Sequence, residues 1–170
     1  MSATAGPAPV RISLVLNGAP TEVEVETGDF LLDVLRERLG LTGSKRSCDS
    51  EVCGACTVLL DGLPVSSCTL LAWETRHRRV ETIEGLARDG RLHPVQQAFL
   101  EESGFQCGFC TPGMIMTIKA LLEDEPDASE DALKAGLRGN ICRCTGYVSI
   151  LSAARSAQRR LREAGPPSSR

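Results

Sequence analysis

The sequence of 170 residues has few aromatic side chains, only 4% of the total, and it contains two histidines. No apolar run approaches the roughly 20 residues of a membrane-spanning helix, so we expect no membrane span. The formal net charge of −3 gives no electrostatic reason to expect nucleic-acid binding. The first nine residues lack a basic segment followed by an apolar one, which argues against a secretory signal and favours a cytoplasmic protein. No Ser/His/Asp set, phosphate-binding loop or carboxylate pair stands out, so we expect no catalytic residue in this chain.

The spacing of the cysteines is the feature of the sequence that says most about its chemistry. Eight cysteines fall into two sets of four, and none is left over. The first set has the spacing C-x4-C-x2-C-x11-C and consists of Cys48, Cys53, Cys56 and Cys68. The second joins a C-x2-C pair to a distant C-x-C pair and consists of Cys107, Cys110, Cys142 and Cys144. In a reducing compartment, clustered cysteines usually bind metal.

The spacing of the first set is typical of a [2Fe–2S] cluster. Such a cluster needs four thiolates, two for each iron, and C-x4-C-x2-C with a distant fourth cysteine is the plant-type ferredoxin pattern. Gly54 and Ala55 would let backbone N–H groups approach the sulfurs and offset the negative charge of the cluster. A structural zinc site and four disulfides are the alternatives. Zinc ribbons usually pair two C-x2-C knuckles, which neither set does, and a cytoplasmic chain disfavours disulfides.

The second set is predicted to lie at the starts of two helices. Thr111-Pro112 and Thr145-Gly146 each follow a cysteine and precede an amphipathic segment. Threonine is a good N-cap and proline suits the first helical position. The positive end of a helix dipole favours bound negative charge and lowers the pKa of a thiol. We therefore expect the two cysteine pairs to clamp one cluster between two helix N-termini.

Hydrophobic periodicity predicts an α+β fold with two domains. Alternating residues predict a hairpin of strands 10–16 and 21–26 around Asn17-Gly18, and further strands at 57–60, 63–66 and 80–83. Asp29 is predicted to cap a helix at 30–39. Longer helices are expected at 93–102, 112–123, 129–137 and 146–162. The prediction is a sheet domain at 10–83 and a four-helix bundle at 84–164, between a disordered N-terminus at 1–9 and a frayed tail at 165–170.

Several motifs resemble those of a known family. They are C-G-A-C-T-V from Cys53, T-I-E-G-L-A from Thr82, His93-Pro94, Q-C-G-F-C-T-P-G-M from Gln106 and G-N-I-C-R-C-T-G-Y from Gly139. In these, the chain resembles the small iron–sulfur subunit of the molybdenum hydroxylases, the group of xanthine dehydrogenase, aldehyde oxidoreductase and carbon monoxide dehydrogenase. The likeness runs from about residue 10 to 157. The sequence departs from the usual pattern in the first loop, where Ser47 precedes Cys48 and residues 49–52 contain no glycine.

The resemblance implies both the architecture and the function. It implies an N-terminal β-grasp ferredoxin-like domain and a C-terminal four-helix bundle, each holding one [2Fe–2S] cluster on the four cysteines of its set. Electrons would pass one at a time from a molybdopterin centre in a large subunit, through the helical-domain cluster and then the other, to FAD in a medium subunit. Gln106 would contact the molybdopterin. The chain would thus be a non-catalytic subunit of an oxidoreductase.

Two other functions stay open at this stage. A free-standing two-cluster carrier would need neither the helical domain nor a pterin contact from Gln106, so both features count against it. A zinc-bound interaction module conflicts with the cysteine spacing.

Overall fold

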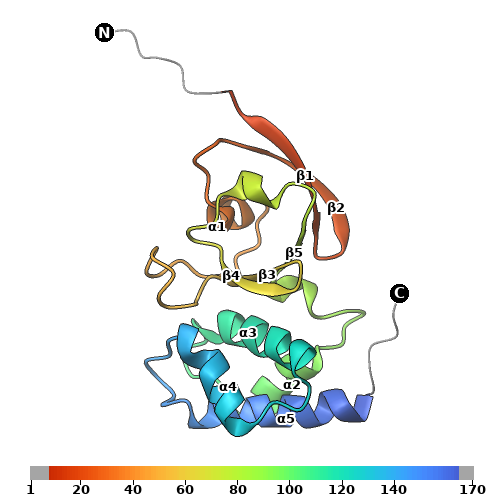
Figure 1. Ribbon diagram of the computed structural model, residues 1–170, viewed down its shortest axis with the longest axis vertical. Helices are drawn as coiled ribbons and strands as arrows, with labels where there is room; N and C mark the ends of the chain where they lie inside the picture. The colour runs from red at the N-terminus through yellow and green to blue at the C-terminus, as the bar shows by residue number, and fades with distance from the viewer. Residues whose placement is uncertain (1–7, 165–170) are drawn as a thin grey trace.

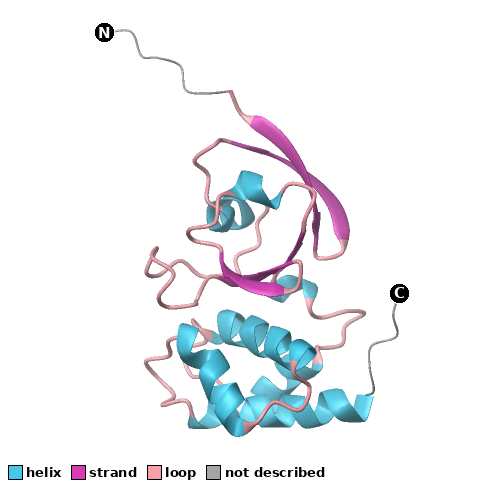
Figure 2. Ribbon diagram, in the orientation of Figure 1, coloured by secondary structure: helices cyan, strands magenta, loops and turns pink. Residues whose placement is uncertain are grey.

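The computed structural model describes residues 8–164. The predicted tail at 165–170 and most of the predicted disordered segment at 1–9 lie outside these residues. Figure 1 shows the sheet in one half of the molecule and the long helices in the other, and Figure 2 shows that the strands are confined to the first half. The predicted α+β class is confirmed, because five strands precede the four longer helices along the chain.

The hairpin at the start of the chain forms as predicted. Strand β1 (Val10–Leu16) pairs antiparallel with β2 (Ala19–Val25), which begins two residues earlier than expected. The two residues between them, Asn17 and Gly18, both have left-handed backbones, with φ of 51° and 85°. Two positive φ values in a two-residue loop are typical of a type I′ turn, whose twist matches that of the paired strands.

Strand β5 joins the two hairpins into one mixed sheet. Strands β3 (Thr57–Leu60) and β4 (Leu63–Ser66) form the second hairpin, and the strand order is β2-β1-β5-β3-β4. Strand β5 (Arg79–Glu81) lies parallel to β1 and antiparallel to β3. The predicted strand at 80–83 ends too late, because the Thr82 N–H donates to Asn17 Oδ1 at 2.8 Å and a 3₁₀ turn begins at Ile83.

The helix of the sheet half is shorter than predicted and has a different start. Helix α1 (Leu31–Asp33) continues directly into a π-helical turn at Val34–Arg38. The predicted cap by Asp29 is wrong: Phe30 is the N-cap residue. The Asp29 carboxylate instead accepts the N–H of Glu26 at 2.6 Å and pairs with Arg38 at 2.6 Å. The apolar side chains of this helix are buried in the core of the sheet half.

Four helices make up the other half, all within two residues of their predicted bounds. They are α2 (Pro94–Glu101), α3 (Thr111–Asp124), α4 (Glu130–Gly136) and α5 (Val148–Ala164). Helix α2 packs on α3 and α5, and α4 packs on the same two helices. One apolar core lies between them, with Phe99, Met114 and Ile150 among its fully buried members. His93 caps α2, since its Nδ1 accepts the N–H of Val95 at 3.3 Å.

The two halves are joined by packing and by a buried ion pair. Helix α3 lies against β3 and β4 (Figure 1), and Leu59 of β3 belongs to the core of the helical half. The Lys119 side chain on α3 is only 9% exposed. It pairs with Glu81 of β5 at 2.8 Å and with Glu123 of its own helix at 2.9 Å. A desolvated ammonium is stable there only because two carboxylates neutralise and hydrogen-bond it.

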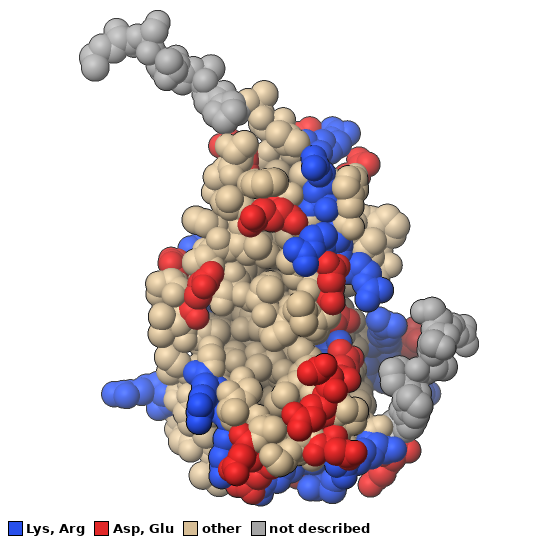
Figure 3. Space-filling model, viewed as in Figure 1, with Lys and Arg blue, Asp and Glu red and all other residues tan. Residues whose placement is uncertain are grey.

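The surface carries charges of both signs. On the face drawn in Figure 3, acidic and basic side chains both border a broad uncharged area. With a formal net charge of −3, this distribution has no strong single-sign field that would attract a polyanion. Among residues 8–164, no helix combines the length and the apolar character needed to cross a bilayer.

Candidate metal centres

The structure brings the first set of cysteines to one place. Three of them lie in the loop between the π-helical turn and β3, and Cys68 follows β4. Cys56 and Cys68 are buried, with 2% and 3% of their surface exposed, and they pack against the fully buried Leu32. Cys48 and Cys53 are partly exposed. The set therefore has an inner and an outer pair.

The local electrostatics differ between the two pairs. Hydrogen bonds from the backbones of Ser50 and Cys53 lower the pKa of Cys48 to about 6. The second of these joins Cys53 N to Cys48 Sγ at 3.4 Å. Burial instead raises the pKa of Cys68 to about 11, although the backbone N–H of Glu51 opposes this by donating to the thiol. The outer thiol is ready to bind metal, whereas the inner one must lose a proton when metal arrives.

The second set also divides into two pairs. Cys107 and Cys144 are exposed, and their Sγ atoms lie 3.6 Å apart. Cys110 and Cys142 are partly buried and within hydrogen-bonding reach of each other. A disulfide requires sulfurs about 2.05 Å apart, and all eight cysteines are free thiols. The disulfide alternative is therefore excluded in this structure.

The predicted threonine caps of the second set are wrong, for different reasons. Cys110 itself is the N-cap residue of α3, and the buried Thr111 hydroxyl has no hydrogen-bond partner. Thr145 does not begin a helix, because Gly146 and Tyr147 adopt left-handed backbones and α5 starts at Val148. The Thr145 hydroxyl instead donates to Cys142 Sγ at 3.2 Å. Its role is to stabilise a thiolate.

Burial and hydrogen bonding compete at the inner pair of the second set. Burial raises the pKa of Cys110 to about 12. Burial also opposes the charged form of Cys142, but hydrogen bonds from the side chain and backbone of Thr145 and from the backbone of Cys144 outweigh it. The pKa of Cys142 falls to about 7 as a result. Each set thus combines a thiol that ionises readily with one that burial keeps neutral.

The donor sets fit clusters better than single ions. A zinc site needs four donors around one point, whereas a [2Fe–2S] cluster takes two thiolates on each of two irons. Sulfurs gathered in pairs, with N–H and O–H donors directed at them, suit the second arrangement. The thiol-only donor set also suits iron–sulfur chemistry.

Tyr147, the last residue of the G-N-I-C-R-C-T-G-Y motif, joins two backbone groups of the second cysteine loop. Its hydroxyl accepts the N–H of Cys142 at 2.9 Å and donates to the Asn140 carbonyl at 2.9 Å. Its left-handed backbone, with φ of 68°, turns the ring back across the loop that it closes. Tyr147 therefore braces the segment that presents Cys142 and Cys144. Only its position within the G-N-I-C-R-C-T-G-Y motif could have suggested this role.

Replacing Tyr147 by phenylalanine should loosen this loop. The change leaves the Cys142 N–H and the Asn140 carbonyl without their partner, so the free energy of unfolding should fall by about 1–2 kcal/mol. The second set should also lose bound iron faster than the first when a chelator is added. Chelation followed by visible absorption would measure this, with Trp73→Phe as a control at an exposed aromatic residue of the sheet half. Equal rates of iron loss from Tyr147→Phe and wild type would contradict the assigned role.

The loops of the two sets touch through backbone groups. The Ile141 N–H donates to the Cys53 carbonyl at 2.9 Å, directly linking the residue before Cys142 to a cysteine of the other set. The buried Asn140 side chain adds a second link: its Nδ2 donates to the Gly54 carbonyl at 3.1 Å. Its Oδ1 accepts from the Thr117 hydroxyl at 2.9 Å, so the amide is satisfied on both sides. Figure 1 shows both loops on the same side of the molecule.

This contact requires two glycines. A Cβ on Gly54, whose φ is +67°, would lie 2.3 Å from the Gly139 carbonyl oxygen. A Cβ on Gly113 would lie 2.1 Å from the Gly54 carbonyl oxygen. Both distances are far below van der Waals contact and involve backbone atoms. The close approach expected at Gly54 therefore exists, but toward the other half of the molecule.

Gln106 lies beside the outer pair of the second set. Its side chain is exposed, next to the exposed Cys107, and it makes no hydrogen bond to any of residues 8–164. An amide in this position can reach a group outside the chain.

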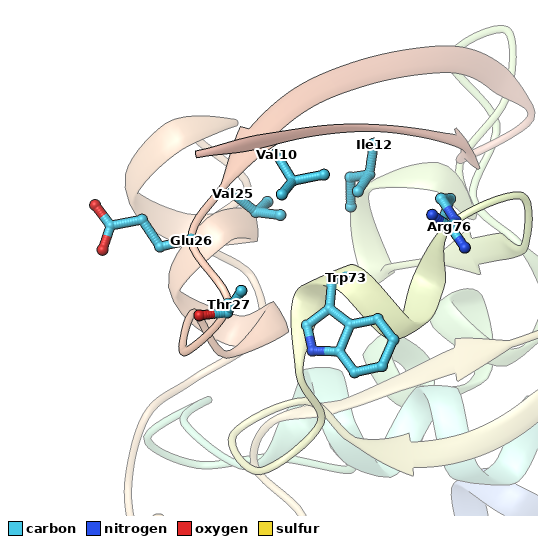
Figure 4. A pocket seen from close by; sticks show the side chains of 7 residues that line it. All are labelled: Val10, Ile12, Val25, Glu26, Thr27, Trp73 and Arg76. Carbon is cyan, nitrogen blue, oxygen red and sulfur yellow. The ribbon is translucent and has the colours of Figure 1, made fainter. Parts of the chain in front are cut away.

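One surface hollow lies away from the cysteines. It has a volume of about 320 Å³, and Figure 4 shows Trp73 facing Val10, Ile12 and Val25 across it. Its lining is mostly apolar and contains no cysteine. The hollow therefore does not belong to either metal centre.

Two family models together match residues 14–155 of the chain. A "2Fe-2S iron-sulfur cluster binding domain" matches residues 14–87, and a "[2Fe-2S] binding domain" matches residues 82–155. Each match contains one complete set of four cysteines.

Related proteins include subunits of several dehydrogenases. The nicotinate dehydrogenase small FeS subunit of Eubacterium barkeri is 46% identical over 89% of this chain and 96% of its own length. A probable xanthine dehydrogenase subunit of Bacillus subtilis is 44% identical over 92% of both chains.

Solved structures agree with these relatives. Quinoline 2-oxidoreductase from Pseudomonas putida superposes with a TM-score of 0.83 at 41% identity, over 89% of this chain and 97% of the matched one. Aldehyde oxidoreductase from Desulfovibrio desulfuricans gives a TM-score of 0.87 at 39% identity, over 90% of this chain, but this chain covers only 17% of it. Fold, cysteine sets and relatives agree: the chain belongs to the small [2Fe–2S] subunits of the molybdenum hydroxylase family, which are non-catalytic electron-transfer subunits of oxidoreductases.

Proposed function

We propose that this chain conducts electrons from a molybdopterin centre in a large subunit to FAD in a medium subunit. The observation that carries the proposal is the direct contact between the two cysteine loops. One hydrogen bond, from the Ile141 N–H to the Cys53 carbonyl, joins the set in the sheet half to the set in the helical half. A short, rigid connection of this kind suits transfer between two fixed centres.

The eight cysteines are the proposed ligands. Cys48, Cys53, Cys56 and Cys68 would hold one [2Fe–2S] cluster, and Cys107, Cys110, Cys142 and Cys144 the other. The 3.6 Å separation of the Cys107 and Cys144 sulfurs supports their sharing one iron, which leaves Cys110 and Cys142 for the second. When bound, such clusters accept and donate single electrons. The chain's own contribution is to supply the thiolates and to direct N–H and O–H donors at them.

The helical half is the proposed contact with the large subunit. Apolar side chains around the second set are exposed: Phe109 by 44%, Ile141 by 48% and Val148 by 79%. Uncovered apolar surface beside a functional site is typical of a protein interface. We propose that Gln106, on the same surface, contacts the molybdopterin. The aldehyde oxidoreductase is much longer than this chain, which supports partner subunits that supply the remaining domains.

Domain organisation and location form part of the same proposal. We assign residues 10–83 to a β-grasp ferredoxin-like domain and residues 84–164 to a four-helix bundle. The packing of α2, α3, α4 and α5 around one core supports the second assignment. Cysteines that serve as metal ligands rather than as disulfides suit a reducing compartment, which supports a cytoplasmic location.

Purification under anaerobic conditions tests the proposal. The chain, tagged and expressed with its neighbouring genes, should be brown, contain about four irons, and lose visible absorption when dithionite is added. It should co-purify with a large and a medium chain and be reduced by the substrate of that complex. An iron-loaded chain that always ran alone would favour the free-standing carrier. A colourless chain holding zinc would contradict both functions.

A further inference from the structure

The loop between Cys48 and Cys53 has an unusual backbone for its sequence. Asp49 and Glu51 both lie in the left-handed region, with φ of 54° and 62°. Residues with a side chain seldom adopt this conformation, and short polar residues such as aspartate tolerate it better than glutamate does. Something in the surrounding structure must therefore hold Glu51 in place.

Side-chain contacts on both sides supply that restraint. The Glu51 carboxylate accepts a hydrogen bond from the hydroxyl of Thr69, the residue after Cys68. The Asp49 carboxylate pairs with Arg46 at 2.5 Å, and Arg46 also pairs with Asp33 of α1. The contact between Glu51 and Thr69 links the loop to the segment that carries Cys68. The pairs made by Arg46 link the loop to α1.

The restrained backbone places N–H groups close to the sulfurs of Cys48 and Cys68. The N–H of Cys53 donates to Cys48 Sγ at 3.4 Å. The backbones of Ser50 and Glu51 lie close enough to Cys48 and Cys68, respectively, to favour their thiolates. Left-handed residues within a turn direct neighbouring N–H groups to one side, which makes a concave site for negative charge. The loop with positive φ at Asp49 and Glu51 therefore places backbone N–H groups beside the ligand sulfurs.

We propose that Glu51 is a positioning residue that sets the reduction potential of the cluster on Cys48, Cys53, Cys56 and Cys68. Its carboxylate, held by the Thr69 hydroxyl, keeps the backbone in the conformation that directs N–H groups at two ligand sulfurs. Hydrogen bonds to sulfur stabilise the more negative, reduced cluster and so raise its potential. The inference rests on the proposed function, because it requires a cluster on these four cysteines.

Two substitutions separate the positioning role from the charge of Glu51. Thr69→Val removes the hydroxyl and keeps the carboxylate, so the loop loosens and the potential should fall. Glu51→Gln removes the charge and keeps an oxygen that accepts from Thr69, so the potential should rise. Thr69→Ser retains the hydroxyl and should behave as wild type. Thr21→Val is the matched control, since the Thr21 hydroxyl bonds only to the Ala19 carbonyl in the first hairpin.

The measurement is a potentiometric titration of the full complex followed by electron paramagnetic resonance, which resolves the two clusters. Thr69→Val should shift the reduction equilibrium of the first cluster by roughly threefold to tenfold, or about 30–60 mV. The second cluster should not move. Thr69→Val could also lose the first cluster altogether. If Thr69→Ser then retains it, the result still supports the role of the hydrogen bond between Thr69 and Glu51.

Three results would overturn the proposal. They are an unchanged potential in Thr69→Val, an equal shift of both clusters, and shifts of the same sign in Thr69→Val and Glu51→Gln. A wild-type chain without iron on the first set would instead refute the proposed function itself. The two failures are therefore distinguishable.

Discussion

Replacing Cys110 with serine should reduce the iron content from about four to about two per chain, and Cys56→Ser should do the same at the other set. Both thiols belong to the less exposed pair of their set. Water therefore cannot take the place of the sulfur ligand that the substitution removes. Loss of a hydrogen-bonding partner around a metal typically costs 10–100-fold in affinity or activity. Loss of a ligand should therefore lower substrate-driven reduction of the acceptor by roughly 100-fold or more.

The two variants are controls for each other. Cys110→Ser should keep the resonance signal of the first cluster, and Cys56→Ser that of the second. Iron analysis and electron paramagnetic resonance on the purified complex would measure both outcomes. Full iron content and two intact signals in Cys110→Ser would show that this thiol is not a ligand.

The second large effect is expected at the junction of the two halves. Gly113→Ala places a methyl group 2.1 Å from the Gly54 carbonyl oxygen, where two backbones meet and no side chain can move aside. Relief of the clash requires α3 to shift from the first cysteine loop, which also strains the bond between Asn140 and Gly54. We expect the free energy of unfolding to fall by about 3 kcal/mol.

Urea unfolding would measure this loss with two probes. Trp73, the single tryptophan, reports on the sheet half, and circular dichroism reports mainly on the helices. Their transitions should coincide in wild type and separate in Gly113→Ala, because the contact that couples the halves is weakened. Gly28→Ala is the matched control, since no atom lies within 4 Å of its added Cβ. Equal stability of the two variants would contradict the assigned contact.

Local sequence signals predicted much of the fold. The alternation in β1 and β2 and the amphipathic faces of α3 and α5 placed those elements to within two residues, because each pattern is set by neighbours in the sequence. The C-x4-C-x2-C and C-x2-C spacings are local signals of the same kind, whereas the approach of Cys144 to Cys107 joins residues 37 positions apart. The parallel pairing of β5 with β1 has no local signal, because it joins residues about 65 positions apart.

The contacts that shape the sites were harder to predict. The Thr111 cap failed because Cys110 already occupies the N-cap position, and the Asp29 cap failed because Arg38 and the Glu26 N–H take up its carboxylate. Asn140 and Gly113 were missed because their partners lie in the other half of the chain. Such roles depend on three-dimensional neighbours, which no periodicity in a single sequence encodes.

The two cysteine loops meet through main-chain atoms. This affects how one half of such a protein could be exchanged for that of a relative. The Ile141 N–H and the Cys53 carbonyl are present whatever side chains those residues carry. A chimaera that joined this helical half to the sheet half of a distant relative would have to keep Gly54, Gly113 and Asn140 at the contact of the loops. It would also have to keep a carboxylate at position 81 for the buried Lys119.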